Sequence, residues 1–301
     1  MSGQVNAWNV FSASARSASY LIFLQLFTRL LTFAFNQLIL RHTTPATFGF
    51  ATIQLELLAS TVLFLSREGF RIALQREQEA IQRTINLAFI PAGLGVFGSF
   101  LGCWMLWRGA DEETTRIGGF GASIVLCGVA TVVELLAEPA FIIAQKLLLF
   151  RLRTIAEGTA VVLRCAVTYF ITTHLARRGT LDEYGAIPFG LGQLAYAIVL
   201  TGLLTFFVSM HRDLRPKPIA SEGEKGRTCM FRQPTLILAF SITGQSLFKH
   251  VLTEGDKFVL TMLTTPYTQG IYAVVSNYGT VFSQGGSHVR LLDREDPLSA
   301  S

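Results

Sequence analysis

The feature that most constrains this chain is a series of apolar blocks, each long enough to cross a membrane as a helix. A membrane-spanning helix needs about 20 mainly apolar residues, whereas strands of a membrane barrel are roughly half as long and alternate strictly. The sequence therefore predicts an all-α fold, a polytopic transmembrane helical bundle. The predicted spans are Ala18–Leu40, Phe48–Leu65, Ile85–Trp107, Gly118–Ile143, Ala156–Leu175, Ile187–Met210, Leu236–Leu252 and a weaker Phe258–Phe282.

Composition excludes an ordinary soluble domain. Only 15% of the 301 residues are charged, against about 25% in a typical soluble protein. The polar segment Met1–Ser17 lacks the pattern of a signal peptide, and the polar segment His211–Pro234 is too short for a catalytic domain. We therefore expect no enzyme, no catalytic residue, no cofactor and no metal site. The net charge of +5 is interpreted as a topology signal and not as a nucleic-acid-binding signal.

Lysine and arginine gather on one side of the predicted bundle. Because cytoplasmic loops of membrane proteins carry an excess of these residues, we place the N-terminus in the cytosol. The predicted cytosolic segments then hold fourteen positive residues and the opposite segments hold five. The fourteen are Arg16, Arg67, Arg71, Arg76, Arg83, Lys146, Arg151, Arg153, Arg212, Arg215, Lys217, Lys225, Arg227 and Arg232, and the five are Arg41, Arg108, Arg116, Arg177 and Arg178.

The order of the spans predicts two unequal parts. Residues 1–210 are expected to form an N-terminal six-helix lobe, followed by a basic cytosolic loop at 211–234 and the first helices of an incomplete C-terminal lobe at 235–284. Residues 285–301 form a polar tail. We interpret this pattern as a truncated chain, and a natural seven-span protein with a polar tail is the alternative.

Several charged residues fall within or beside the first two spans. Such groups cost several kcal/mol at membrane depth unless they are paired or face water, so each is a candidate for function. Arg29 lies midway along the first span and Arg41 lies at its far end; a structural pair between Arg29 and Glu56 is the alternative. Arg67 and Arg71 are one helical turn apart at the cytosolic end of the second span. A cluster that only sets the topology is the alternative there.

Two carboxylates share one face of the fourth predicted span. Glu134 and Glu138 are one turn apart, and like charges at this spacing need a cation or a raised pKa. We expect an interhelical structural pair, with Glu157 and Arg164 on the fifth span as candidate partners.

The densest set of ionisable residues is Lys249–Lys257, between two apolar runs. Glu254 and Lys257 can pair within a helix, whereas Lys249 and Asp256 need partners on other spans. The glycine in this set is expected to loosen the helix, and broken helices at membrane depth usually line a cavity. If one site in the chain contacts a substrate, we expect it here.

Five ordered stretches resemble one protein family, the dolichol-linked oligosaccharide translocation proteins, or Rft family. The resemblance extends from about Ala15 to about Tyr278, after which further expected spans are missing. The stretches are FNQLILRHTT (Phe35–Thr44), FLSREGFR (Phe64–Arg71), ELLAEPAFIIAQ (Glu134–Gln145), IAEG (Ile155–Gly158) and KHVLTEGDKFVL (Lys249–Leu260).

The resemblance implies a eukaryotic endoplasmic-reticulum membrane protein of the multidrug/oligosaccharidyl-lipid/polysaccharide flippase superfamily, with helices in two lobes. Its implied partners are the lipid bilayer and a dolichol-diphosphate oligosaccharide, which moves from the cytosolic to the lumenal leaflet for N-glycosylation. Such a substrate needs a wet cavity with cations for its diphosphate. The candidate substrate-binding residues are Arg29, Arg41, Arg67, Arg71, Lys249, Glu254, Asp256 and Lys257.

Three alternatives stay open. A membrane accessory or scaffold protein of dolichol-oligosaccharide assembly would have the same spans and cations. A polyprenol-dependent glycosyltransferase would need acidic residues in sizeable loops, and the only such loop cluster is Asp111–Glu113. An ion-coupled drug exporter would use Glu134 and Glu138 as a proton site, and the family motifs argue against it.

Overall fold

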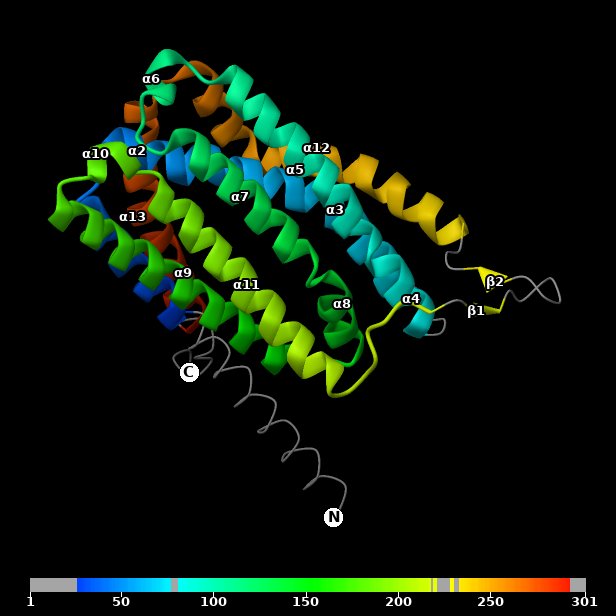
Figure 1. Cartoon of the computed structure of the whole chain (residues 1–301). Coiled ribbons are helices and arrows are strands. Elements are labelled where there is room, and N and C mark those ends of the chain that lie inside the picture. The colour runs from blue at the N-terminus through cyan, green and yellow to red at the C-terminus, as the bar shows by residue number, and fades with distance from the viewer. Residues whose placement is uncertain (1–25, 77–80, 218, 221–227, 230–232, 293–301) are drawn as a thin grey trace, which may run out of the picture.

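The computed structural model describes residues 26–76, 81–217, 219–220, 228–229 and 233–292 (Figure 1). Within these ranges the regular secondary structure is helical apart from one antiparallel pair of two-residue strands, which confirms the all-α prediction. The elements after a first helix Leu26–Leu40 are α2 Pro45–Gly49, the π-helix η1 Phe50–Leu55, α3 Glu56–Arg76, α4 Ile81–Ala88, α5 Ile90–Gly109, α6 Glu112–Thr115, α7 Phe120–Leu135, α8 Glu138–Lys146, α9 Phe150–Arg178, α10 Leu181–Tyr184, α11 Ile187–Ser209, β1 Ile219–Ala220, β2 Thr228–Cys229, α12 Gln233–Leu263 and α13 Pro266–Leu292.

Six helical segments in the described part of the chain are long and apolar enough to cross a membrane, so this is a multi-pass membrane protein. The helix Leu26–Leu40 is apolar but shorter, and the earlier part of the first predicted span lies outside the described residues. The six segments are Pro45–Gln75, Ile81–Gly109, Phe120–Lys146, Phe150–Arg178, Ile187–Ser209 and Pro234–Leu263.

The largest difference from the predicted spans concerns the last two helices. The seventh span was expected to end at Leu252, but α12 continues without interruption to Leu263. The expectation that Gly255 loosens this helix is therefore wrong. The eighth helix begins at Pro266 and not at Phe258, because proline is accommodated in the first turn of a helix, where its missing N–H is not needed.

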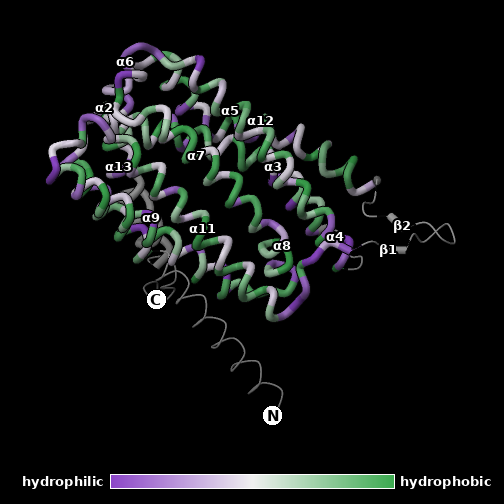
Figure 2. The backbone as a smooth tube through the Cα atoms, in the orientation of Figure 1, coloured by the Kyte–Doolittle hydropathy of each residue, from purple (hydrophilic) through white to green (hydrophobic). Residues whose placement is uncertain are grey.

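The connections alternate between two ends of the bundle. Figure 1 places α6, α10 and the start of α13 at one end, and α4, α8 and the β1–β2 pair at the other. Figure 2 shows hydrophobic colouring along the helices and hydrophilic colouring around α6 and α10 at one end and around α4 at the other. The end that contains α4 and β1–β2 is the end to which the predicted cytosolic loops belong.

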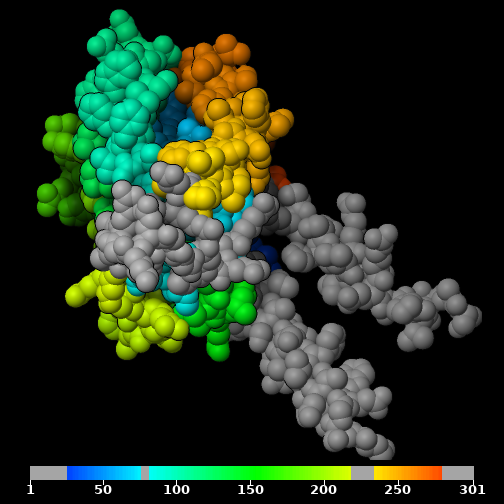
Figure 3. Space-filling view, turned by 90° about the vertical axis from the view of Figure 1, so that its right-hand side faces the viewer, coloured from blue at the N-terminus to red at the C-terminus, as the bar shows by residue number. Residues whose placement is uncertain are grey.

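The helices pack as two connected groups. Helix α11 lies against α7 and α9, while α12 lies along α3 and α13 packs on α2 and η1. In Figure 3, α12 and α13 form one flank of the molecule, with part of the blue-to-cyan region of η1 and α3 visible beside them. The main apolar core lies between α3, α8 and α11, where Phe70, Ile142 and Leu204 are fully buried.

The predicted fourth span is broken into α7 and α8 close to its cytosolic end. Residues Leu136 and Ala137 form a turn, and Pro139 occupies the first turn of α8. Proline removes a backbone donor and clashes with the preceding turn, which interrupts a helix at this point. The break changes the direction of the chain between Glu134 and Glu138.

Two short segments far apart in the chain have the same sequence pattern and the same local structure. Thr44–Gly49 reads TPATFG and Thr265–Gly270 reads TPYTQG, and each begins a helix. In both, the hydroxyl of the first threonine accepts a hydrogen bond from the backbone N–H of the second, at 3.3 Å and 3.4 Å. Each threonine is therefore an N-cap, as its residue type favours.

The same two segments lie against each other. A Cβ atom at Gly49 would overlap the Pro266 carbonyl oxygen, and a Cβ at Gly270 would overlap the Pro45 carbonyl oxygen. Beside this contact, Gln269 on α13 accepts a hydrogen bond at 3.0 Å from the side-chain amide of a buried glutamine on η1. The reciprocal contact brings the start of α2 and the start of α13 together backbone to backbone.

Candidate functional site

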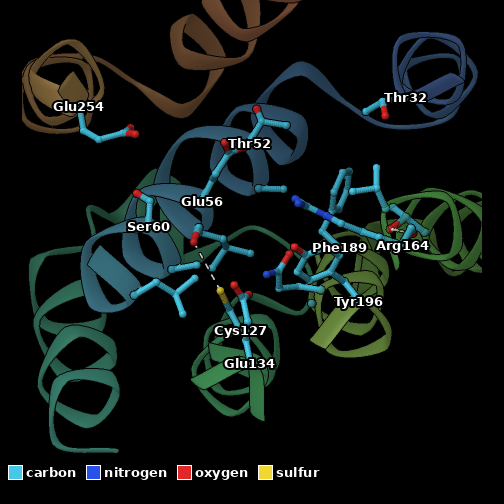
Figure 4. A pocket seen from close by; sticks show the side chains of 18 of the residues that line it. Thr32, Thr52, Glu56, Ser60, Cys127, Glu134, Arg164, Phe189, Tyr196 and Glu254 are labelled. Carbon is cyan, nitrogen blue, oxygen red and sulfur yellow. Dashed lines mark hydrogen bonds between the residues drawn. The ribbon is translucent and has the colours of Figure 1, made fainter. Parts of the chain in front are cut away.

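A cavity of about 600 Å³ lies among the helices that cross the membrane (Figure 4). Its walls come from the helix Leu26–Leu40, η1, α3, α7, α9, α11, α12 and α13. Polar and charged side chains are numerous on these walls although the helices are apolar overall. They include Asn36, Thr52, Glu56, Ser60, Arg67, Glu68, Arg71, Glu134, Arg164, Gln193, Tyr196, His250, Thr253 and Glu254.

Two arginines of α3 face two glutamates of the broken fourth span, and we call these four residues the arginine–glutamate cluster. Arg67 is 2.8 Å from Glu134 and 3.6 Å from Glu138. Arg71 binds Glu138 with two hydrogen bonds, from Nε at 2.8 Å and from Nη2 at 2.6 Å. This two-pronged geometry is the strongest form of an arginine–carboxylate pair.

Helical spacing explains one side of the cluster: Arg67 and Arg71 are one turn apart on α3. Glu134 and Glu138 lie on either side of the break between α7 and α8, and each faces one of the two arginines, so two pairs form side by side. The ring of Phe141 lies 3.6 Å from the guanidinium carbon of Arg71, measured to the ring centroid, which adds a cation–π contact. Both glutamates are buried, so the arginines supply the counter-charge that burial requires.

The charged residues of α12 make a second set of contacts, mainly with α3, which we call the lysine contacts. Lys249 is 3.4 Å from Glu68. Lys257 is 2.9 Å from Glu254 on its own helix and 3.5 Å from Glu56. The predicted pairing of Glu254 with Lys257 is confirmed.

Two further residues of α12 also find partners on other helices. Asp256 accepts a hydrogen bond at 2.8 Å from the Tyr272 hydroxyl on α13. The imidazole of His250 stacks on Phe64 with ring centroids 4.7 Å apart, and its Nε2 lies 3.0 Å from the Thr61 hydroxyl. The expectation that Lys249 and Asp256 need partners on other spans is confirmed.

Two candidate substrate-binding residues lie away from the cavity. Arg29 is exposed on the helix Leu26–Leu40, and Arg41 is exposed just after this helix ends. Neither belongs to the cavity wall. The alternative pair of Arg29 with Glu56 does not form in the described part of the chain, since the ion-pair partner of Glu56 there is Lys257.

Comparison with known protein families gives one decisive match. The family described as "Rft protein" matches residues 13–283 of this chain. The chain belongs to the Rft family. This confirms the resemblance that the sequence motifs indicated.

Relatives of this Rft-family chain share the name "Man(5)GlcNAc(2)-PP-dolichol translocation protein RFT1". The relative from Yarrowia lipolytica is 33% identical, and the match covers 91% of this chain and 46% of the relative. The relatives from Xenopus tropicalis and Mus musculus are each 31% identical, with 91% of this chain and 53% of the relative covered. The chain thus spans about half the length of the curated relatives it matches. No solved structure matches the chain.

The cavity of this Rft-family protein includes residues that sequence reasoning did not select. Arg164 on α9 was considered only as a cation for Glu134 and Glu138, a role that Arg67 and Arg71 take instead. Glu157, the other candidate, pairs with Arg153 at 2.8 Å. Hydropathy could have pointed to Arg164, because it is an isolated charge in the middle of a span.

Gln193 and Tyr196 also lie on the cavity wall. They are uncharged residues within an apolar helix, so no sequence signal marked them. Their spacing of three residues places both on one face of α11.

Proposed function

We propose that this chain takes part in moving a dolichol-diphosphate-linked oligosaccharide from the cytosolic to the lumenal leaflet of the endoplasmic-reticulum membrane, for protein N-glycosylation. The observation that carries the proposal is the polar and charged cavity inside a bundle of membrane-spanning helices of an Rft-family protein.

The physical need for such a cavity follows from the substrate. A diphosphate and a hydrated glycan cannot enter hydrocarbon without losing their hydration, which is costly for charged and hydroxyl groups. The polyprenyl tail can remain in lipid throughout. A path for the head group therefore requires polar walls between the helices, and the cavity supplies arginine, glutamate, amide and hydroxyl side chains at membrane depth.

The candidate substrate contacts divide by position. Arg67, Arg71 and Glu254 line the cavity itself, so they are the stronger candidates. Lys249, Asp256 and Lys257 lie on α12, where they hold neighbouring side chains of α3 and α13. In this proposal these three residues position the cavity wall, and the role of Arg29 and Arg41 is at the surface.

The proposed orientation has the N-terminus in the cytosol. The excess of lysine and arginine in the connections that include α4 and β1–β2 supports it. A protease added to sealed microsomes should cleave an N-terminal tag and the 211–234 loop. If both segments were protected from the protease, the proposed orientation would be wrong.

The decisive experiment is functional replacement. This chain is expressed in yeast cells whose own Rft gene has been shut off, and glycosylation of a secreted reporter is measured together with the abundance of the chain. Restored glycosylation supports the proposal. Underglycosylation at normal abundance of the chain contradicts it.

A second measurement separates transport from an accessory role. The purified chain is reconstituted in vesicles that carry a fluorescent dolichol-diphosphate oligosaccharide, and its access to an external lectin is followed. Faster movement than in protein-free vesicles identifies a translocator. Restored glycosylation in cells without movement in vesicles identifies a membrane accessory protein of oligosaccharide assembly.

A further inference from the structure

The cations on the cavity wall differ in whether a carboxylate already holds them. Arg67 and Arg71 are bound by the glutamates of the arginine–glutamate cluster. Arg164 is not: among the side chains described in residues 26–75, 81–217 and 234–279, its guanidinium has no carboxylate within 4.0 Å and no hydrogen-bond partner. Among the described arginines that line the cavity, Arg164 is therefore the one whose guanidinium is not already bound by a carboxylate.

Arg164 lies at the depth where an unpaired charge is most expensive. It is the middle residue of the 29-residue helix α9. At 1.5 Å per residue this places it about 21 Å from either end of the helix, near the centre of the bilayer. An ionised side chain at that depth requires a counter-charge or water. Because no described carboxylate pairs with the Arg164 guanidinium, its charge is available for an anion that enters the cavity.

The two sides of the cavity have opposite character. Figure 4 shows Glu56, Ser60 and Glu254 on the side formed by α3 and α12, and Arg164 and Tyr196 on the side formed by α9 and α11. The two glutamates share a single lysine, so the acidic surplus lies on their side. The potential of the cavity therefore becomes more positive toward α9 and α11.

Helix packing brings the polar groups of α9 and α11 together. A Cβ atom at Gly192 would lie 3.0 Å from the Arg164 carbonyl oxygen, so α11 approaches α9 closely at this level. Gln193 and Tyr196 follow on α11 and line the same cavity. A guanidinium, an amide and a phenol hydroxyl can all donate hydrogen bonds, which is the donor set that phosphate oxygens accept.

We propose that Arg164, together with Gln193 and Tyr196, forms the subsite that binds the diphosphate of the lipid-linked substrate. This inference rests on the proposed function and adds to it the position of the head group within the cavity. The planar guanidinium can bind two phosphate oxygens at once, which a lysine cannot do. The glycan then faces the hydroxyl and carboxylate groups on the α3–α12 side.

The test measures binding directly, apart from transport. Tritiated farnesyl diphosphate is titrated against the full chain in detergent micelles, with inorganic pyrophosphate, farnesol and phosphatidylserine as competitors. We expect pyrophosphate to compete and farnesol not to compete, because the site recognises the anion. Phosphatidylserine should compete at least tenfold less well. Equal competition by phosphatidylserine would show a site for any lipid phosphate and would overturn the diphosphate assignment.

Three variants locate the site. Arg164→Gln should weaken farnesyl diphosphate binding about tenfold or more, the loss of one strong charge-assisted contact. Arg178→Gln, the same substitution at the exposed end of the same helix, should change binding less than twofold. Arg164→Lys should retain more binding than Arg164→Gln because it keeps the charge. If monodisperse Arg164→Gln binds as well as the unaltered chain, or if Arg164→Lys binds no better than Arg164→Gln, the proposal is wrong.

The replacement assay in cells keeps this inference separate from the proposed function. If the chain binds farnesyl diphosphate through Arg164 but does not restore glycosylation, the result supports the subsite and contradicts the proposed function. If the Arg164→Gln variant restores glycosylation at normal abundance, the result supports the proposed function and contradicts the subsite.

Discussion

The arginine–glutamate cluster and the lysine contacts both tie α3 to a neighbour, but their geometry differs. In the cluster, the main contacts between α3 and α7–α8 measure 2.6–2.8 Å, and the Glu138 side chain is 2% exposed. The lysine contacts between α3 and α12 measure 3.4–3.5 Å, and the Lys249 side chain is 67% exposed. A buried pair leaves an uncompensated charge when one member is removed, whereas an exposed pair is replaced by water.

The comparison assigns different roles to the two sets of charges. The cluster fixes α3 against α7 and α8 inside the predicted N-terminal lobe, with two-pronged arginine contacts. The lysine contacts hold α12, the first described helix after that lobe, through flexible side chains and longer distances. The ion pairs within the lobe are therefore short and buried, whereas those that join α12 to the lobe are longer and more exposed.

Removing the carboxylate of Glu138 should produce the largest effect. Glu138→Gln leaves Arg71 buried without its counter-charge, so we expect the free energy of unfolding to fall by about 3 kcal/mol or more. The measurement is the melting temperature of the purified protein in detergent. Glu112→Gln is the matched control, because Glu112 pairs with Arg116 at the surface and both side chains are at least 80% exposed. Equal melting temperatures for the two variants would remove the distinction between buried and exposed pairs.

Changing the shape of the cation but not its charge tests the two-pronged contact. Arg71→Lys keeps the ion pair with Glu138 and loses one of its two hydrogen bonds and the stacking on Phe141. We expect a loss of about 1.5 kcal/mol, between those of Glu138→Gln and the control. A melting temperature unchanged from the parent would show that charge alone holds the cluster.

A smaller loss of stability is expected on substitution of Lys257, which forms ion pairs with two carboxylates. Lys257→Met should cost about 1 kcal/mol, since the side chain is partly exposed and its contact with Glu56 is long. A double-mutant cycle with Glu56→Gln isolates the pair across the two helices. A coupling energy as large as that of Arg71 with Glu138 would contradict the view that α12 is held more loosely.

Lys249 should give the smallest effect. Its exposed ion pair with Glu68 is worth at most about 0.5 kcal/mol, and Lys249→Met should leave the melting temperature nearly unchanged. High salt should reduce even this difference, because exposed charges are screened. A loss comparable to that of Lys257→Met would mean that Lys249 contributes through packing, as its position near the Phe64 ring allows.

The fold could be predicted because hydrophobicity is read directly from the sequence. Apolar blocks of spanning length predicted the helices. Because successive spans run in opposite directions, they also predicted that the connections alternate between the two ends of the bundle. Helix limits were less certain where charges occur inside a helix. The predicted end at Leu252 was wrong because the charged turn that follows is satisfied by α3 and α13, so the helix can continue.

The candidate site could be predicted only in part. The pairing of Glu254 with Lys257 is local, and helical spacing alone predicts it. The pairing of Arg67 and Arg71 with Glu134 and Glu138 joins separate helices, and no spacing rule specifies which helices become neighbours. The place of Arg164 opposite the acidic side of the cavity has the same origin in tertiary packing.

The contact between Gly49 and Gly270 has a consequence for how loss of function would be interpreted in this protein. Any side chain at either position meets backbone atoms that have no rotamer to change, so alanine should be as damaging as a larger residue. A substitution scan scored only by activity would therefore rank these two glycines with the cavity arginines. The set of tolerated residues would tell them apart, since a glycine position rejects every Cβ whereas an arginine position accepts another cation in part.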